Sequence, residues 1–254
     1  MKNNIFLFSH QDDEIAVFKT IKDKVKKNED IFIFFLTNGN IYNYNNIDLI
    51  LKRENESKKV LKLLGINLKN IIFLGRNLDI NSYDLLNHLD DAYQQLSNFI
   101  NKLNDEIEIY THAWEGGNID HDACFVLVLK LMRNHNNIKY GYQFPFYNSY
   151  KMPLNLYRVF YPIKKNGQAV KCEISFEEKK EFIKYLFYYT SQLKIWIGLY
   201  PLVIIKILIN EYNYLQAINS NFKLQRPHEN PLLYEKQKFI SFEKIIILFN
   251  SFLN

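Results

Sequence analysis

The sequence predicts an α/β fold, with an open, mostly parallel sheet and helices on both faces. Four short apolar runs rich in Ile and Phe lie in the first 115 residues, and each is typical of a buried strand. Segments with a helical pattern separate these runs, and such alternation is typical of right-handed βαβ units. We therefore expect a Rossmann-like core over residues 1–140.

Each expected element follows from its own residue pattern. The strands are the runs NIFLFS, IFIFFLTNG, NIIFLG and EIEIYTHA, and the first three are apolar enough to be buried on both faces. Helices are expected at residues 13–27, 47–65, 81–103 and 121–135. Gly65 lies where the second helix needs a positive φ to end, and Ser82 or Asn81 is placed to cap the third.

The C-terminal half predicts a cap and further helices. Residues 140–163 are crowded with Tyr and Pro, and we interpret them as β-rich or irregular chain that covers the sheet. Aromatic side chains clustered in this way most often pack a cap against a sheet. Ser175 and Glu178 have the spacing of a capping box. We expect one domain over residues 1–254, with the cap and C-terminal helices in 141–254.

Composition and charge argue against several classes of protein. The net charge of +5 comes from scattered lysines, so nucleic acid is not an expected partner. Cys124 and Cys172 are far apart in sequence, which argues against a disulfide scaffold and for a reducing compartment. The N-terminal apolar run is too short for a signal peptide, so we expect a cytoplasmic protein.

One apolar segment raises the question of membrane contact. Residues 195–209 are fewer than the roughly 20 residues of a membrane span, and Pro201 and Lys206 interrupt them. Buried helices with a bend at Pro201 are the favoured interpretation. Interfacial membrane contact is the alternative and is not expected.

Polar residues collect where each expected strand ends. In an open α/β sheet, ligands bind outside the carboxyl ends of the strands, because loops and helix N-termini converge there. The residues after the four strands are, in order, Ser9, His10, Gln11, Asp12, Asp13 and Glu14; Thr37, Asn38 and Gly39; Arg76, Asn77 and Asp79; and His112, Glu115, Asn118, Asp120, His121 and Asp122. We expect the functional site at this edge of the sheet.

His10 and Asp13 have the spacing of two ligands to one cation. An imidazole and a carboxylate three residues apart at a strand-to-helix turn can share a metal, and mixed nitrogen and oxygen ligands favour zinc. His121 is the best-placed third ligand, which leaves the fourth position for water, and Asp12 would face that water. The alternative is that these acids only stabilise a helix N-terminus and that His121 lies in the cap of another helix.

Several motifs together resemble those of the PIG-L/LmbE deacetylases. SHQDDE at residues 9–14 is similar to the AHPDDE signature, and EGGNIDHDA at residues 115–123 is similar to the later Glu-Gly-Gly-His-x-Asp-His-Asp segment. LTNG and RENESKKVLKLLGI agree with the family's Thr-x-Gly and Arg-x-x-Glu motifs in the expected order, and YYTSQ is a weaker match. The resemblance covers roughly residues 3–192.

This resemblance implies a zinc hydrolase that removes the N-acetyl group from an N-acetylated amino sugar. The substrate would be a glycoconjugate or a nucleotide sugar, and the reaction would serve glycan biosynthesis. Carried to this sequence, the family pattern makes His10, Asp13 and His121 the zinc ligands and Asp12 the general base.

Substrate binding is assigned to three residues. Arg53 matches the family's substrate-binding arginine, and its paired donors suit a phosphate. The alternative for Arg53 is an ion pair with Glu56 or another surface acid. Asn38 and Arg76, at two other strand ends, are further candidates.

The sequence departs from the family pattern at Asn118, where the family has a histidine that helps to stabilise the tetrahedral intermediate. An asparagine amide can donate a hydrogen bond to an oxyanion but cannot deliver a proton to the leaving amine. Either Asp12 returns its proton to the nitrogen, or His112 takes over as the acid. Asp120 loses the histidine that it would have oriented, so we expect it to act only through neighbouring residues.

Two other functions compete with the deacetylase. The first is a non-catalytic sugar-conjugate binding protein of the same fold, because Asn118 replaces the histidine. The second is a metal-free nucleotide-binding domain, against which the absence of a Gly-x-Gly-x-x-Gly turn counts. The sequence does not indicate which sugar, acyl group or aglycone is used, nor the oligomeric state.

Overall fold

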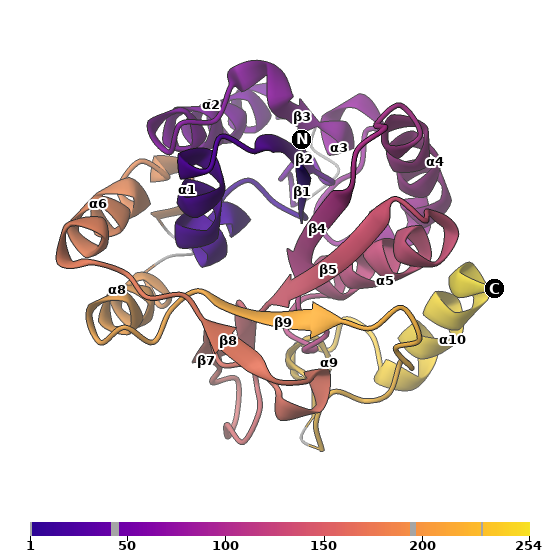
Figure 1. Cartoon of the computed structure of the whole chain (residues 1–254). Helices are drawn as coiled ribbons and strands as arrows, with labels where there is room; N and C mark the ends of the chain where they lie inside the picture. The colour runs from indigo at the N-terminus through magenta and orange to yellow at the C-terminus, as the bar shows by residue number, and fades with distance from the viewer. Residues whose placement is uncertain (1, 42–45, 194–196, 230) are drawn as a thin grey trace.

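The computed structural model describes residues 2–41, 46–193, 197–229 and 231–254. Within them, seven strands form one sheet in the order β3-β2-β1-β4-β5-β9-β8 (Figure 1). The strands are β1 (Asn3–Phe8), β2 (Asp30–Phe35), β3 (Ile71–Phe73), β4 (Ile107–His112), β5 (Ile138–Phe144), β8 (Ala169–Lys171) and β9 (Tyr214–Ile218). β1 to β5 are parallel, and β9 is antiparallel to both β5 and β8. A separate ribbon pairs β6 (Tyr147–Asn148) with β7 (Arg158–Val159).

Strand β1 is buried on both faces because its side chains alternate between two hydrophobic cores. Phe6 and Phe8 pack in one core, and Ile5 and Leu7 pack in the other. Successive side chains of a strand point to opposite faces, so a continuous apolar run suits a strand that is covered on both sides. The predicted fold class, a mostly parallel sheet between two layers of helices, is confirmed.

Helices cover both faces of the sheet (Figure 1). α1 (Phe18–Lys26), α2 (Ile47–Leu63), α6 (Phe176–Leu186) and α8 (Tyr200–Leu208) pack in the core that contains Phe6, whereas α4 (Leu89–Ile100), α5 (Ile119–Asn134) and α10 (Phe242–Leu253) pack in the other. The shorter helices are α3 (Leu74–Asn77), α9 (Leu233–Lys236) and the 3₁₀ turns η1 (Asp13–Val17), η2 (Leu68–Asn70), η3 (Leu85–His88), η4 (Lys164–Asn166) and η5 (Thr190–Gln192). Two predicted local features are confirmed, since Gly65 has a φ of +98° and α6 begins with the capping box of Ser175 and Glu178.

The strand order reverses between β1 and β4. From β1 the chain moves outward through β2 and β3, and it then returns to the other side of β1 with β4 and β5. The loops after β1 and β4 therefore diverge and leave a crevice at the carboxyl edge, which is where open α/β sheets bind ligands.

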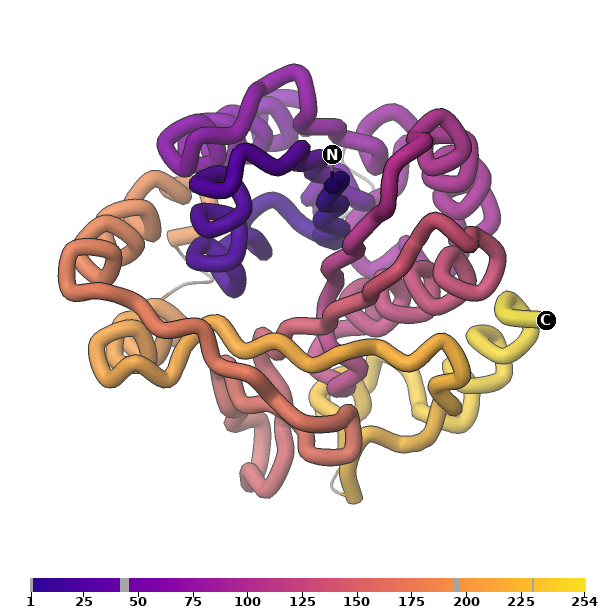
Figure 2. The backbone as a smooth tube through the Cα atoms, in the orientation of Figure 1, coloured from indigo at the N-terminus to yellow at the C-terminus, as the bar shows by residue number. Residues whose placement is uncertain are grey.

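Strands that we expected in a cap belong to the sheet instead. β5 begins before residue 140 and pairs in parallel with β4, and β9 and β8 extend the sheet from much later in the chain (Figure 2). The interpretation of residues 140–144 as cap is therefore wrong. Three of the seven residues of β5 are exposed or partly exposed, so the strand lacks the continuous apolar run that marks the first three strands.

The third predicted helix begins later than expected, and the prediction that Asn81 or Ser82 caps it is wrong. Helix α4 begins at Leu89, after the turn η3. The backbone N–H groups of Tyr83 and Leu85 donate instead to the carboxylate of Asp120, which holds this loop in a non-helical conformation.

The apolar segment 195–209 differs in part from expectation. Residues 195 and 196 lie outside the described residues, and Pro201 occupies the first turn of α8 rather than a bend. Val203 and Ile207 are buried, whereas Ile205 and Leu208 are each 52% exposed, so this helix is only half buried. Among the helices described, none has the length and apolar character to cross a bilayer.

Candidate active site

The turn after β1 is built around the carboxylate of Asp13. Its Oδ2 accepts hydrogen bonds from Ser9 Oγ at 2.7 Å and from the backbone N–H of His10 at 2.6 Å. The side chain thus folds back on the end of the strand, where it is almost fully buried. The spacing of SHQDDE therefore has a local explanation, because a carboxylate three residues after His10 can close this turn.

Two stacked histidines lie beside Asp13. His112 ends β4 and His121 lies in the first turn of α5, and their ring centroids are 3.8 Å apart. His112 Nε2 is 3.1 Å from Asp13 Oδ2, and His121 Nε2 is 3.4 Å from Asp13 Oδ1. Burial alone would raise the pKa of Asp13, but the surrounding imidazoles outweigh it and hold that pKa well below its usual value. Burial lowers the pKa of both His112, to about 3, and His121.

His10 is held between two carboxylates. Its Nε2 lies 3.0 Å from Oδ2 of Asp120, in the first turn of α5, and its Nδ1 lies 3.4 Å from Asp13 Oδ2. Burial alone would lower the pKa of His10, but Asp13 and Asp120 together raise it to about 10. Asp120 therefore does have a histidine to orient, and that histidine is His10.

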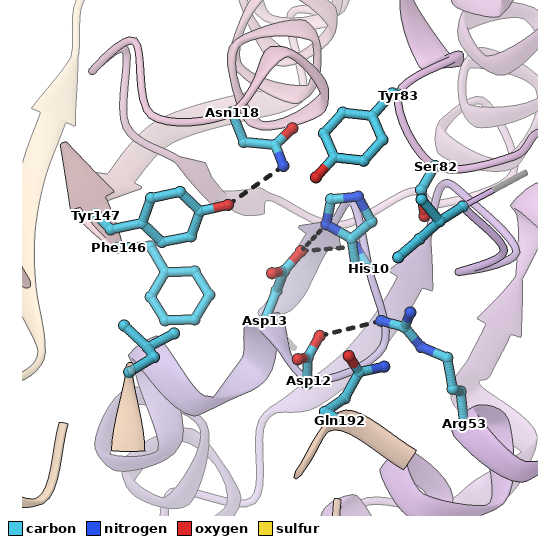
Figure 3. Close-up of a pocket in the computed structure, with 12 residues that line it drawn as sticks. His10, Asp12, Asp13, Arg53, Ser82, Tyr83, Asn118, Phe146, Tyr147 and Gln192 are labelled. Carbon is cyan, nitrogen blue, oxygen red and sulfur yellow. Dashed lines mark hydrogen bonds and ion pairs between the residues drawn. The ribbon is translucent and has the colours of Figure 1, made fainter. Parts of the chain in front are cut away.

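Asp12 has an unusual backbone conformation. Its φ of +115° lies in the left-handed region that residues other than Gly rarely adopt. The side chain lies beside Asp13 at the wall of the cavity, with Oδ1 3.4 Å from Nη2 of Arg53 (Figure 3). Burial raises the pKa of Asp12 to about 8, although the guanidinium of Arg53 opposes that rise.

Arg53 reaches the cavity from α2 and is not the partner of Glu56. Its Nη1 and Nη2 donate to the backbone carbonyls of Gly39 and Gln11 at 2.6 and 3.0 Å. The Gln192 amide is oriented with its oxygen toward the Arg53 guanidinium, because that group offers only donors. Its Oε1 accepts from Arg53 Nε at 2.8 Å. Glu56 instead accepts hydrogen bonds from the turn η5, which carries Gln192.

Asn118 links helix α5 to Tyr147. Its Oδ1 accepts from the backbone N–H of Asp120 at 2.8 Å and so caps the helix. Its Nδ2 donates to the Tyr147 hydroxyl at 3.2 Å. The amide is therefore fixed in orientation by contacts at both ends.

These groups surround an open cavity (Figure 3). The cavity is lined by His10, Asp12, Asp13, Ile41, Arg53, Ser82, Tyr83, Asn118, Phe146, Tyr147, Gln192 and Leu199. His121 is fully buried behind this lining, with its ring centroid 5.6 Å from that of His10. The predicted ligands and the predicted base thus lie together at the crevice between β1 and β4.

Besides the buried His121, three predicted site residues are not among those that line the cavity. Asn38 accepts from the backbone N–H of Asn40 and donates to Asn81, so it joins two loops. Arg76 pairs with the buried Glu54 at 3.1 Å, because that carboxylate needs a partner. His112 lies behind Asp13. The expected substrate contacts of Asn38 and Arg76 are therefore not supported by their positions.

Several residues of the lining were missed by sequence reasoning. Tyr83, Phe146 and Tyr147 reach the cavity from loops and from β6. The aromatic stretch at residues 140–163 pointed to this region without distinguishing which tyrosine faces the site. For Gln192, the available signal was the weak match of YYTSQ.

The residues fit a metal ion. One donor atom from each of His10, Asp13 and His121 lies within 4.8 Å of the other two. Neither ring nitrogen of the buried His121 has a hydrogen-bond partner among the described residues, although buried polar atoms are normally satisfied. Coordination of a metal ion by the His121 ring would supply a partner for one of these nitrogens. Asp13 Oδ2 accepts the two hydrogen bonds that close the turn, whereas Oδ1 faces His121.

An α/β sheet that presents two imidazoles and a carboxylate at its switch point, beside a second carboxylate, is the arrangement of a metal-dependent hydrolase. The family model of the GlcNAc-PI de-N-acetylase, PIG-L, matches residues 5–132, just over half of the chain. The chain therefore belongs to the PIG-L family of deacetylases, which are metal-dependent amide hydrolases, as its motifs indicated. No curated protein sequence matches the chain.

Solved structures share the fold. The zinc-inhibited form of teicoplanin deacetylase is 11% identical, with a TM-score of 0.60 over 85% of this chain and 96% of that one. N,N'-diacetylchitobiose deacetylase from Pyrococcus horikoshii is 16% identical, with a TM-score of 0.60 over 89% of this chain and 86% of that one. At such low identity the likeness extends to the fold alone.

Proposed function

We propose that this protein removes the N-acetyl group from an N-acetylated amino sugar in a glycoconjugate or nucleotide sugar. The observation that carries the proposal is the clustering of His10, Asp13 and the buried His121 beside Asp12, at the wall of one cavity. The family's GlcNAc-PI de-N-acetylase activity and the chitobiose deacetylase among the structural neighbours support it. We also propose that residues 1–254 form one domain of this family, because β9 and β8 complete the sheet.

His10, Asp13 and His121 would hold the metal, and two imidazoles with one carboxylate are a donor set that zinc commonly takes. Zinc would supply a water of lowered pKa and polarise the acyl carbonyl. The residues around the ligands fix them in place. Asp120 orients the ring of His10, and His112 with Ser9 holds Oδ2 of Asp13.

Asp12 is the proposed general base. It accepts a proton from the attacking water and then returns this proton to the amine as the C–N bond breaks. His112 is the less suitable acid, because it lies behind Asp13 and does not line the cavity. We therefore assign His112 to the positioning of Asp13.

Arg53 is the proposed contact for an anionic part of the substrate. Its guanidinium lines the cavity next to Asp12, and it is held rigidly by two backbone carbonyls and Gln192. A guanidinium fixed in this way can present its positive charge to a phosphate with little loss of side-chain entropy.

Acetate release from a panel of N-acetylhexosamine conjugates tests this function. The panel includes nucleotide-linked, lipid-linked and free oligosaccharide forms, and we expect turnover on at least one of them. Asp12→Asn should reduce the rate by about 10²-fold or more without loss of metal, because it removes the base and keeps the side-chain shape. A rate unchanged in that variant would contradict the assignment of Asp12.

Elemental analysis separates the hydrolase from its main rival. We expect about one zinc per chain in the purified protein, and loss of zinc in both His121→Ala and Asp13→Ala. Zinc without acetate release from any conjugate would favour the non-catalytic binding protein. Absence of zinc after reconstitution would show that only the fold has been kept.

A further inference from the structure

Tyr147 lines the cavity, and several residues of the β4–α5 loop contact its backbone or its hydroxyl. Glu115 Oε1 accepts from the backbone N–H groups of Phe146 and Tyr147 at 2.8 and 3.1 Å. Gly117 lies so close to strand β6 that a Cβ atom there would be 1.9 Å from the Tyr147 carbonyl oxygen. Asn118 donates to the hydroxyl itself. One short loop therefore sets the position of both the backbone and the side chain of Tyr147.

The direction of the hydroxyl proton follows from the fixed amide of Asn118. Because Oδ1 accepts from the helix N-terminus, Nδ2 must be the atom that faces Tyr147. The hydroxyl oxygen is then an acceptor toward Asn118, and its own proton is free to point elsewhere. Among the described residues, no acceptor for that proton is found, and the side chain lines the cavity.

The hydroxyl also lies near the candidate metal ligands. The Tyr147 and His121 ring centroids are 5.2 Å apart, and Tyr147 and Asn118 face Asp12 and Arg53 across the cavity (Figure 3). A carbonyl bound beside the ligands would therefore have a hydrogen-bond donor on one side and the base on the other. Donors aimed at the place where charge develops are among the largest contributions to catalysis of acyl transfer.

We propose that Tyr147 is a catalytic residue, whose hydroxyl donates a hydrogen bond to the oxyanion that develops on the acyl carbonyl, and that Asn118 is its positioning residue. This inference rests on the proposed amide hydrolysis. It gives the asparagine at position 118 a specific task, which is to turn the tyrosine proton toward the substrate.

Tyr147→Phe tests the proposal, because it removes only the hydroxyl and keeps the ring that packs against Phe146 and Tyr157. We expect kcat to fall about 100-fold on the best conjugate of the panel, with KM changed less than about threefold. Tyr157→Phe is the matched control, since it removes a neighbouring hydroxyl that does not line the cavity. A kcat for Tyr147→Phe close to that of the control, or a loss confined to KM, would overturn the proposal.

A second readout needs no turnover. Methylphosphonate resembles the tetrahedral intermediate of deacetylation, whereas acetate is planar, and both can be titrated into the zinc-loaded protein. We expect Tyr147→Phe to weaken methylphosphonate binding about tenfold and acetate binding less than about twofold. Equal effects on both ions would overturn the role of the hydroxyl. If the wild type released no acetate from any conjugate, the proposed function would fail, while this titration would still decide whether the hydroxyl binds a tetrahedral anion.

Asn118→Ala tests the positioning role. We expect kcat to fall with little change in KM, and the double variant with Tyr147→Phe to be no slower than Tyr147→Phe alone, because both changes remove one interaction. Fully additive losses would show that Asn118 acts independently of the tyrosine.

Discussion

Oδ2 of Asp120 lies 3.0 Å from Nε2 of His10, so a carboxylate on α5 orients an imidazole that follows β1. These residues are 110 positions apart in sequence. Asp120 also binds the backbone of the loop before α4. One buried side chain thus connects three of the loops around the cavity. It also determines which ring nitrogen of His10 faces Asp13.

Asp120→Asn should weaken zinc binding by about 10- to 100-fold, because the amide lacks the negative charge that holds and orients His10. The zinc affinity is measured by competition with a chelating dye. Asp91→Asn is a suitable control, since that side chain is 68% exposed on α4. Equal zinc affinity in Asp120→Asn and the wild type would contradict an orienting role.

Arg53→Lys should lower kcat/KM about 100-fold on a phosphate-containing conjugate, because an ammonium cannot reproduce the fork that holds both carbonyls and the anion. Arg76→Lys is the matched control, because Arg76 pairs with Glu54 and does not line the cavity. Steady-state kinetics on paired phosphorylated and neutral substrates check the prediction. An equal loss on both substrates would indicate that Arg53 acts through Asp12 rather than on phosphate.

Gly117→Ala should lower the free energy of unfolding by about 2 kcal/mol, because its Cβ would overlap the Tyr147 carbonyl oxygen and push strand β6 away. Acetate release should fall as well, since Tyr147 moves with the strand. Gly198→Ala is the control, where the added Cβ meets its nearest atom at 3.6 Å. Urea unfolding of both variants measures the difference, and a wild-type midpoint for Gly117→Ala would refute the close approach.

Glu108 makes part of the protein's stability sensitive to acid. Burial alone would raise its pKa, but hydrogen bonds from Lys2, Lys24 and Tyr110 lower that pKa to about 2, from an ordinary value of 4.5. Because the folded pKa lies below the unfolded one, the charged form stabilises the fold above about pH 4.5, and this stabilisation is lost as the pH falls toward 2.

Glu108→Gln should therefore be less sensitive to acid than the wild type. Between pH 6 and pH 3 we expect the wild type to lose about 2 kcal/mol more of its free energy of unfolding than this variant does. Glu106→Gln, a change at an exposed neighbour, should behave as the wild type. Parallel pH dependence in Glu108→Gln and the wild type would exclude this source of acid sensitivity.

The fold could be predicted where burial leaves a clear pattern. β1 is covered on both faces, so every residue from Ile5 to Phe8 is apolar and the strand is evident. Three of the seven residues of β5 are exposed or partly exposed, and β8 has only three residues, so neither produces such a run. The start of α4 was missed for another reason, since a tertiary contact with Asp120 overrides the local capping signal.

The site could be predicted where one short motif builds it. His10, Asp12 and Asp13 follow from SHQDDE, because the turn and the ligands share the same residues. Tyr147 could not be predicted, since its orientation depends on a loop about 30 residues earlier. A cytoplasmic location, the lack of a nucleic-acid partner and the choice of zinc stay predictions.

The backbone of Asp12 has a consequence for engineering. A φ of +115° favours Gly by roughly 1 kcal/mol or more, so the fold would gain from a smaller residue at this position. A library selected for heat resistance alone would therefore be enriched in Asp12→Gly, and the enriched variants would lack the proposed base. Thermostabilisation of this protein should accordingly keep residue 12 fixed and search elsewhere.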